Sequence, residues 1–225
     1  AGIATLENDV IRVEKKKGRL KNLEDVLEKT PLSGQVGIGH TRWATHGVPS
    51  DANAHPHCSV NKEISVVHNG IIENYMSLKD ELQAMGHVFI SDTDTEVIAH
   101  LLNELYNGDL VQTIQIALKR MKGSYALAVL CANEPNKIVA VRKDSPLIVG
   151  LGDGENFIAS DIPAILNYTR DVYLLDNGEM AVLTADAIEV MNSAGQVIDK
   201  EIFVVDWDPG DAEKGGYDHF MMKEM

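Results

Sequence analysis

Cysteine, positive charge and long apolar runs are all scarce in this sequence. Only two cysteines occur in 225 residues, Cys58 and Cys131, which excludes a disulfide framework and fits a reducing cytosol. The 20 basic residues against 34 acidic ones give a formal charge of −14, which argues against nucleic acid or an anionic membrane as main partner. No apolar run approaches a membrane span. We therefore expect a cytoplasmic protein that binds neither.

The composition and length suit a globular protein with a substantial core. Hydrophobic residues make up 44% and charged residues 24% of the chain, which is long enough for one large domain or two small ones. From Asp208 the sequence becomes polar and rich in glycine, as in a connector. We therefore predict one domain over 1–207 and a connector over 208–225. The sequence at 1–6 is typical of the middle of a strand, and residues 217–225 stop without a helix C-cap. We therefore expect both ends to be cut.

Apolar periodicity predicts grouped helices and many strands. Helical spacing occurs over 20–27, 78–85, 98–105 and 111–121, and Gly86 and Gly123 are predicted C-caps. Apolar β-branched runs predict strands at 10–14, 36–43, 64–68, 124–131, 138–142, 147–151, 156–159, 172–175, 180–183 and 188–191. Helices cluster in the first half and strands fill the second, which indicates an α+β layered sandwich.

The stretch from Gly39 to Gly47 is the most informative part of the sequence. It ends an apolar run and then gathers Arg42, Trp43, Thr45 and His46, where a simple surface turn would hold Asn, Gly or Pro. A planar cation, an aromatic wall, hydroxyl groups and imidazoles suit a small polar ligand that carries a carboxylate.

The sequence His68-Asn69-Gly70, directly after an apolar run, allows two interpretations. Asn-Gly is a strong signal for a hairpin turn. Alternatively, the Asn69 side-chain amide and the Gly70 backbone N–H form an oxyanion hole, since glycine lets a substrate approach the backbone closely. The residues that follow do not alternate as a returning strand would, which weakens the hairpin interpretation.

Asp94 also has a structural and a functional interpretation. Thr93 as N-cap and Glu96 three residues later form a capping box, and Asp94 at the first helical position suits the helix dipole. If Arg42 lies nearby in the fold, the two residues form a clamp for a free amino acid. Arg42 then binds the α-carboxylate and Asp94 the α-ammonium.

A metal site is the main rival for the histidines. Five of the eight lie close together in the sequence, at His40, His46, His55, His57 and His68. Their spacing matches no zinc pattern, so hydrogen bonds that order loops are the better interpretation. We therefore expect no metal and no cofactor.

Together these motifs resemble one family, the class II glutamine amidotransferases. Within it, the Trp-Ala-Thr-His-Gly form of the first motif favours the glutaminase domain of the glucosamine-6-phosphate synthases. The resemblance covers nearly the whole chain and is carried by residues 40–47, 53–57, 67–74, 92–97, 145–147, 154–161 and 218–224.

The resemblance implies a fold, residue roles and partners. The fold is an N-terminal-nucleophile-type αββα four-layer sandwich with two antiparallel sheets. The implied roles are glutamine binding for Arg42 and Asp94 and an oxyanion hole for Asn69 and Gly70. Thr45 and His46 line the pocket, and Trp43, also a substrate-binding residue, lies toward the path by which ammonia leaves. The intact enzyme converts fructose-6-phosphate to glucosamine-6-phosphate with a sugar isomerase domain, beyond residue 225, that receives ammonia from L-glutamine. We expect the intact enzyme to be a homo-oligomer.

The nucleophile is the point of departure from the family. These enzymes attack the amide with the thiol of an N-terminal cysteine, whereas this sequence starts at Ala1. Neither Cys58 nor Cys131 can substitute, because neither is N-terminal. We therefore expect the chain as written to lack its first strand and nucleophile and to be inactive. Two alternatives stay open, a non-catalytic amino-acid-binding regulatory module and a metal-dependent hydrolase.

Overall fold

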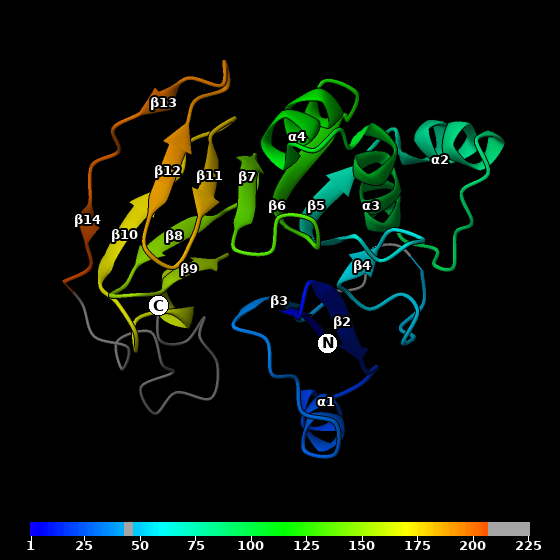
Figure 1. The fold of residues 1–225 in the computed structure, drawn as a ribbon, viewed down its shortest axis with the longest axis horizontal. Helices are drawn as coiled ribbons and strands as arrows, with labels where there is room; N and C mark the ends of the chain where they lie inside the picture. The colour runs from blue at the N-terminus through cyan, green and yellow to red at the C-terminus, as the bar shows by residue number, and fades with distance from the viewer. Residues whose placement is uncertain (43–46, 207–225) are drawn as a thin grey trace, which may run out of the picture.

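The computed structural model describes residues 1–42 and 47–206 (Figure 1). The helices of this part of the chain are α1 (Leu20–Leu27), α2 (Tyr75–Ala84), α3 (Asp94–Leu105), α4 (Leu110–Leu118) and the 3-10 helix η1 (Ile162–Ala164). Its strands are β1 (Gly2–Glu7), β2 (Val10–Lys15), β3 (Val36–His40), β4 (His57–Cys58), β5 (Ile64–Ile72), β6 (Gly123–Cys131), β7 (Ile138–Lys143), β8 (Ile148–Leu151), β9 (Asn156–Ala159), β10 (Asp171–Leu174), β11 (Met180–Leu183), β12 (Ile188–Met191), β13 (Val197–Ile198) and β14 (Phe203–Val204).

These strands form three antiparallel sheets. The largest has seven strands in the order β13-β12-β11-β7-β6-β5-β4. A three-stranded sheet has the order β2-β1-β3, and a four-stranded sheet has the order β14-β10-β8-β9. β3 and β9 are therefore edge strands, and both line one cavity of about 450 Å³.

The seven-stranded sheet lies between the helices and the two smaller sheets (Figure 1). Side chains alternate along β6, so Leu127 and Val129 face α2, α3 and α4, while Leu130 faces the three-stranded sheet. Ala140 on β7 packs in the same way against Val149 of the four-stranded sheet. Burying both faces of this sheet supplies most of the apolar core.

The outermost layer consists of short helical pieces. α1 lies beside β2 and buries Leu23 (Figure 1). Residues in and after η1, including Ile165, pack on the outer face of the four-stranded sheet against Ile148 and Val172. The order helices, sheet, sheets, helices confirms the predicted α+β sandwich. The predicted second sheet is present as two sheets, because no described strand joins the edges of β3 and β9.

The predicted elements match the observed ones with a few informative differences. β5 extends to Ile72, four residues past its predicted end, and passes straight through the Asn-Gly pair. Gly123 starts β6 with φ +116° and caps no helix, since α4 ends at Leu118. Gly86 follows α2 with φ +99°, as predicted for a C-cap. Among the described residues, no helix has the length and apolarity needed to cross a membrane.

Candidate functional site

A cavity of about 170 Å³ lies where the end of β3, the middle of β5 and the start of α3 meet. Its lining residues are His40, Thr41, Arg42, His55, His68, Asn69, Gly70, Thr93, Asp94 and Thr95. Four predicted site residues, from three separate motifs, are therefore brought together: Arg42, Asn69, Gly70 and Asp94.

Arg42 and Asp94 interact electrostatically across this cavity. Partial burial lowers the pKa of Arg42, and the negative charge of Asp94 opposes that shift. Asp94 is 4% exposed, and one of its oxygens, Oδ2, accepts a hydrogen bond of 2.8 Å from the backbone N–H of Ile72. The cavity thus presents a guanidinium and a carboxylate to the same small space.

The start of α3 fixes the position of Asp94. Thr93 caps the helix, and its hydroxyl accepts from the backbone N–H of Glu96 at 3.4 Å. The predicted capping box is only half formed, because the Glu96 carboxylate does not return to Thr93. It accepts from the backbone N–H and hydroxyl of Ser91, at 2.7 and 2.6 Å. Asp94 is therefore held in the first turn of a well-anchored helix.

Asn69 and Gly70 lie within β5, paired with Ala126 and Tyr125 of β6. The hairpin interpretation of this Asn-Gly pair is therefore wrong. Gly70 has φ +131°, and a Cβ there would lie 2.2 Å from the backbone oxygen of Ser124. Only glycine fits this conformation and this space. The strand is locally distorted at the point where it borders the cavity.

His40 at the end of β3 orients the side chain of Asn69. Its Nε2 lies 2.8 Å from Asn69 Oδ1, while its Nδ1 is buried without a hydrogen-bond partner among the described residues. Burial lowers the pKa of His40, so the imidazole is neutral at neutral pH. An unpaired lone pair costs less than an unpaired N–H. The proton therefore sits on Nε2 and is donated to Asn69 Oδ1, which leaves the NH₂ group of Asn69 as its remaining polar end.

Three further buried histidines, of which His55 and His68 line the cavity, hydrogen-bond to threonine hydroxyls. Nε2 of His55 and Nδ1 of His68 lie 2.9 and 3.0 Å from Thr95 Oγ1, and Nε2 of His57 lies 3.1 Å from Thr93 Oγ1. Burial lowers the pKa of all three imidazoles, to about 3 for His57. Within the described residues, no group of three or more His, Cys, Asp or Glu is placed to hold a metal ion.

The remaining predicted site residues, Trp43, Thr45 and His46, lie outside the described residues. On the far side of this gap, the carbonyl oxygen of Gly47 accepts a hydrogen bond of 3.3 Å from the Arg42 guanidinium. From the sequence, His40 was expected only to order a loop through hydrogen bonds, and Thr95 was given no role. Both residues lie in the motifs that carry the family resemblance.

The two thiols lie away from the cavity. Cys58 on β4 donates to the hydroxyl of Ser65 at 3.3 Å, and Cys131 is buried at the end of β6. Burial raises the pKa of both thiols. Neither residue is among those that line the cavity of Arg42 and Asp94.

Comparison with known families settles which family the chain represents. A family model described as a glutamine amidotransferase domain matches residues 40–167. The chain belongs to this family. The match contains all four of the site residues that meet at the cavity.

Relatives of this glutamine amidotransferase domain align with it over its whole length. Proteins named glutamine–fructose-6-phosphate aminotransferase [isomerizing] are 56% identical in Clostridium tetani, 58% in Caldanaerobacter subterraneus and 50% in Thermus thermophilus, each over all 225 residues. The chain spans 37% of the length of each of these relatives.

Two solved structures share the fold. A glutamine phosphoribosylpyrophosphate amidotransferase from B. subtilis, complexed with ADP and GMP, has a TM-score of 0.72 and 24% identity over 87% of this chain. A structure described as the allosteric regulatory enzyme of purine biosynthesis has a TM-score of 0.73 and 23% identity over 87% of the chain. The alignments cover 43% of each of those chains. At this identity the likeness concerns the fold alone, and it confirms the predicted N-terminal-nucleophile type of sandwich.

Proposed function

We propose that this chain is the glutaminase part of a glutamine–fructose-6-phosphate aminotransferase and binds L-glutamine in the cavity of Arg42 and Asp94. The observation that carries this proposal is the pairing of a guanidinium and a buried carboxylate around about 170 Å³ of space. An amino acid offers the complementary charges, with its carboxylate for Arg42 and its ammonium for Asp94. On the family resemblance alone, we also assign Trp43, Thr45 and His46, which lie outside the described residues, to glutamine binding.

Asn69 and Gly70 stabilise the oxyanion that forms when the side-chain amide of glutamine is attacked. His40 holds Asn69 Oδ1, so the NH₂ group is the end of this amide that donates. Gly70 lets the substrate reach its backbone N–H, because no side chain intervenes. Donors that are fixed before the reaction lose little orientational freedom in the transition state, and removing one typically costs about 10²–10³ in kcat.

The nucleophile comes from neither of the two thiols. In this family the attacking thiol belongs to an N-terminal cysteine, and Gly2 of β1 pairs with His40, which lines the cavity. The edges of β3 and β9 line a space of about 450 Å³ over Ala126, Leu127 and Ala128 of β6. Because neither Cys58 nor Cys131 lines the cavity, we propose that a polypeptide of these 225 residues alone binds glutamine without hydrolysing it.

The domain covers 1–207, and residues 208–225 connect it to a sugar isomerase domain that uses the ammonia to make glucosamine-6-phosphate. The names and lengths of the relatives support this assignment. Four exposed apolar side chains near the end of the described chain also support a further packing surface. They are Val197, Ile202, Phe203 and Val204.

Calorimetric titration with L-glutamine, together with an assay for released ammonia, tests this function. We expect saturable binding that Arg42→Ala and Asp94→Asn each weaken by at least ten-fold, because each removes one charge of the clamp. We expect no ammonia above the uncatalysed rate. No binding by the unsubstituted chain, or turnover at an enzymatic rate, would contradict the proposal.

A non-catalytic amino-acid-binding module is the second candidate, and the placement of both thiols away from the cavity favours it. Adding an N-terminal segment that begins with cysteine separates the two candidates. Glutaminase activity in the extended chain supports the enzyme, whereas glutamine binding that persists without ammonia release supports the regulatory module.

A further inference from the structure

Asn53 is a buried amide in a loop, and nothing in the proposed function uses it. Its side chain is 2% exposed, and it belongs to neither a helix nor a strand. Burying an amide is unfavourable unless its polar atoms are hydrogen-bonded. Asn53 meets that requirement with partners from two separate segments, so the arrangement of those segments depends on it.

The first segment is the loop that carries Arg42. Nδ2 of Asn53 donates to the carbonyl oxygen of Val48 at 2.9 Å. Val48 follows Gly47, whose carbonyl oxygen accepts from the Arg42 guanidinium at 3.3 Å. Gly47 packs directly on Asn53, since a Cβ at Gly47 would lie 2.6 Å from Asn53 Nδ2. The amide therefore holds the backbone to which Arg42 is bonded.

The second segment leads into the helix that carries Asp94. Oδ1 of Asn53 accepts from the backbone N–H of Asp92 at 2.9 Å, and its Nδ2 lies 3.3 Å from Asp92 Oδ2. Asp92 is separated from Asp94 only by Thr93, the N-cap of α3. One side chain thus joins the backbone beside Arg42 to the backbone beside Asp94.

We propose that Asn53 is a positioning residue that sets the span between Arg42 and Asp94, and thereby makes the site select a ligand with both an α-carboxylate and an α-ammonium. This inference rests on the proposed function, because it assigns those two residues to the two charged groups of one amino acid. An amide suits this task because it donates and accepts in one plane, which fixes two segments at once.

Asn177 supplies a matched control. Its Oδ1 accepts from the backbone N–H of Asp144 at 2.8 Å, and its Nδ2 donates to Asp144 Oδ1 at 2.8 Å. This is the same two-bond arrangement as that between Asn53 and Asp92. Neither Asn177 nor Asp144 lines the cavity of Arg42 and Asp94.

The experiment compares the affinities of two ligands for the 225-residue chain. L-Glutamine carries both α groups, whereas glutaramate, the analogue without the α-ammonium, engages Arg42 alone. We expect Asn53→Asp to weaken glutamine binding about ten-fold and glutaramate binding about two-fold. A changed distance between Arg42 and Asp94 matters most to a ligand that must contact both residues. The swap Asn53→Asp with Asp92→Asn restores a donor–acceptor pair between positions 53 and 92 but leaves the Val48 carbonyl oxygen without its donor, so it should recover part of the stability and little of the discrimination.

Thermal unfolding of the same variants separates positioning from a purely structural role. Asn177→Asp should lower the melting temperature and leave the ratio of the two dissociation constants unchanged. The inference is overturned if Asn53→Asp weakens both ligands equally or neither, or if the swap recovers the full discrimination although position 53 no longer donates to Val48. If the unsubstituted chain binds glutaramate as tightly as glutamine, Asp94 does not hold the ammonium and the inference is also wrong. Failure of the unsubstituted chain to bind glutamine at all overturns the proposed function itself.

Discussion

The charged residues of the cavity are each also bonded to the backbone. Arg42 donates to the carbonyl oxygen of Gly47, and Asp94 accepts from the N–H of Ile72. These bonds restrict the side chains before any ligand arrives, so less side-chain conformational entropy is lost when a ligand binds. The same bonds tie ligand affinity to the local fold, so substitutions beside the cavity should affect both.

Gly70→Ala tests how strictly the distorted part of β5 requires glycine. A residue with a Cβ is strained at φ +131°, which costs about 1–3 kcal/mol of stability. The clash with the backbone oxygen of Ser124 adds to this cost, since backbone cannot easily move aside. The free energy of unfolding, measured by urea denaturation, should fall by more than the strain alone explains.

Gly86→Ala is the control for this substitution. Gly86 also has positive φ, at +99°, but nothing lies within 4 Å of a Cβ placed there. It should therefore show the cost of the backbone conformation without the clash. Equal losses of stability in the two variants would mean that the close approach of Ser124 to β5 is not as described.

At the scale of elements, periodicity predicted the fold well wherever an element is long. The two-residue strands β4, β13 and β14 were missed, because two residues cannot display alternation. β5 was predicted too short, because its Asn-Gly pair carries a strong turn signal that pairing with β6 overrides. Element type was thus readable from the sequence, while element length was decided by tertiary pairing.

The site was predictable only in part, for a similar reason. Arg42, Asn69, Gly70 and Asp94 carry residue types whose chemistry is visible within short motifs. The role of Asn53 was not visible, because its partner Asp92 lies 39 positions away in the sequence. Contacts between distant segments have no local pattern, so hydrogen-bonded positions of this kind emerge only from the folded chain.

The segment that precedes α3 depends on Glu96. Burial alone would raise the pKa of this carboxyl, but the nearby His100 imidazole and hydrogen bonds from Ile90 and Ser91 outweigh it and lower the pKa to about 2. Glu96→Gln replaces one accepting oxygen with a donor that faces other donors. We expect a loss of about 1.5–3 kcal/mol in the free energy of unfolding, the typical contribution of hydrogen bonds to a charged group.

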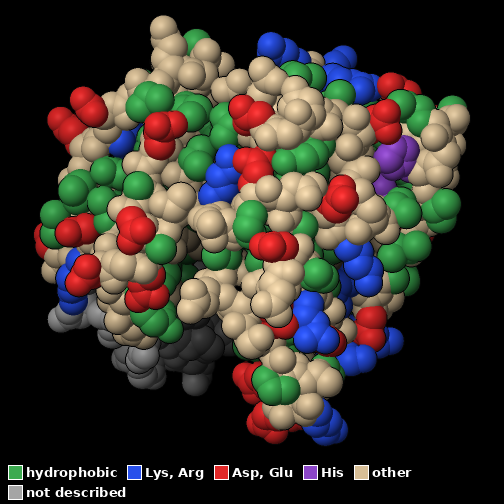
Figure 2. Space-filling view, in the orientation of Figure 1, with side chains coloured by type: hydrophobic (Ala, Val, Ile, Leu, Met, Phe, Trp, Pro, Cys, Tyr) green, Lys and Arg blue, Asp and Glu red, His purple; other side chains and the backbone are tan. Residues whose placement is uncertain are grey.

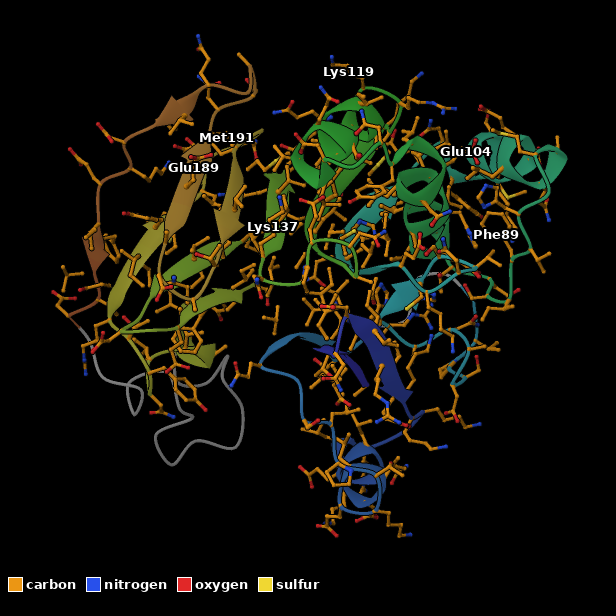
Figure 3. The ribbon with its side chains drawn as sticks, in the orientation of Figure 1. Phe89, Glu104, Lys119, Lys137, Glu189 and Met191 are labelled. Carbon is orange, nitrogen blue, oxygen red and sulfur yellow. The ribbon has the colours of Figure 1, made fainter. Side chains whose placement is uncertain are left out.

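Glu104 on the same helix is the control (Figure 3). Its side chain is 37% exposed and lies 3.0 Å from Nε2 of His87, so this pair is screened by solvent. Glu104→Gln should cost less than about 1 kcal/mol. Losses of the same size in both variants would show that the bonds of Glu96 do not anchor this segment.

For the whole molecule, the notable feature is a core that keeps several histidines neutral. His40, His55, His57 and His68 all have lowered pKa values because they are buried. The surface has a different character, with acidic and basic side chains interspersed among apolar ones on the face in Figure 2. Protonation of the buried cluster, which the unfolded chain permits freely, therefore couples stability to pH.

Stability should fall as the pH drops below about 6.5. Above this value, both the folded and the unfolded chain hold these imidazoles neutral, so they contribute no pH dependence. Below it, the unfolded chain binds protons that the folded chain excludes, and each histidine lowers the free energy of unfolding by up to about 1.4 kcal/mol per pH unit. Glu96 adds to the loss only below about pH 4.5, the ordinary pKa of a glutamate carboxyl.

Urea unfolding at pH values from 8 to 5 measures this effect. A decline that begins near pH 6.5 and becomes steeper towards pH 5 is expected. His57→Gln removes one titrating group, so the free energy of unfolding should fall less steeply with pH, by the contribution of one histidine. A free energy of unfolding that stays constant between pH 7.5 and 5.5 would contradict the burial of these imidazoles in neutral form.

The most direct test of the proposed clamp is a crystal structure of the chain with L-glutamine. We expect the α-carboxylate within about 3 Å of the Arg42 guanidinium and the α-ammonium within about 3 Å of an Asp94 oxygen, as in charge-assisted hydrogen bonds. The side-chain amide should then lie beside Asn69 and Gly70. Glutamine bound elsewhere, or bound here with its charged groups away from Arg42 and Asp94, would contradict the assignment of this cavity.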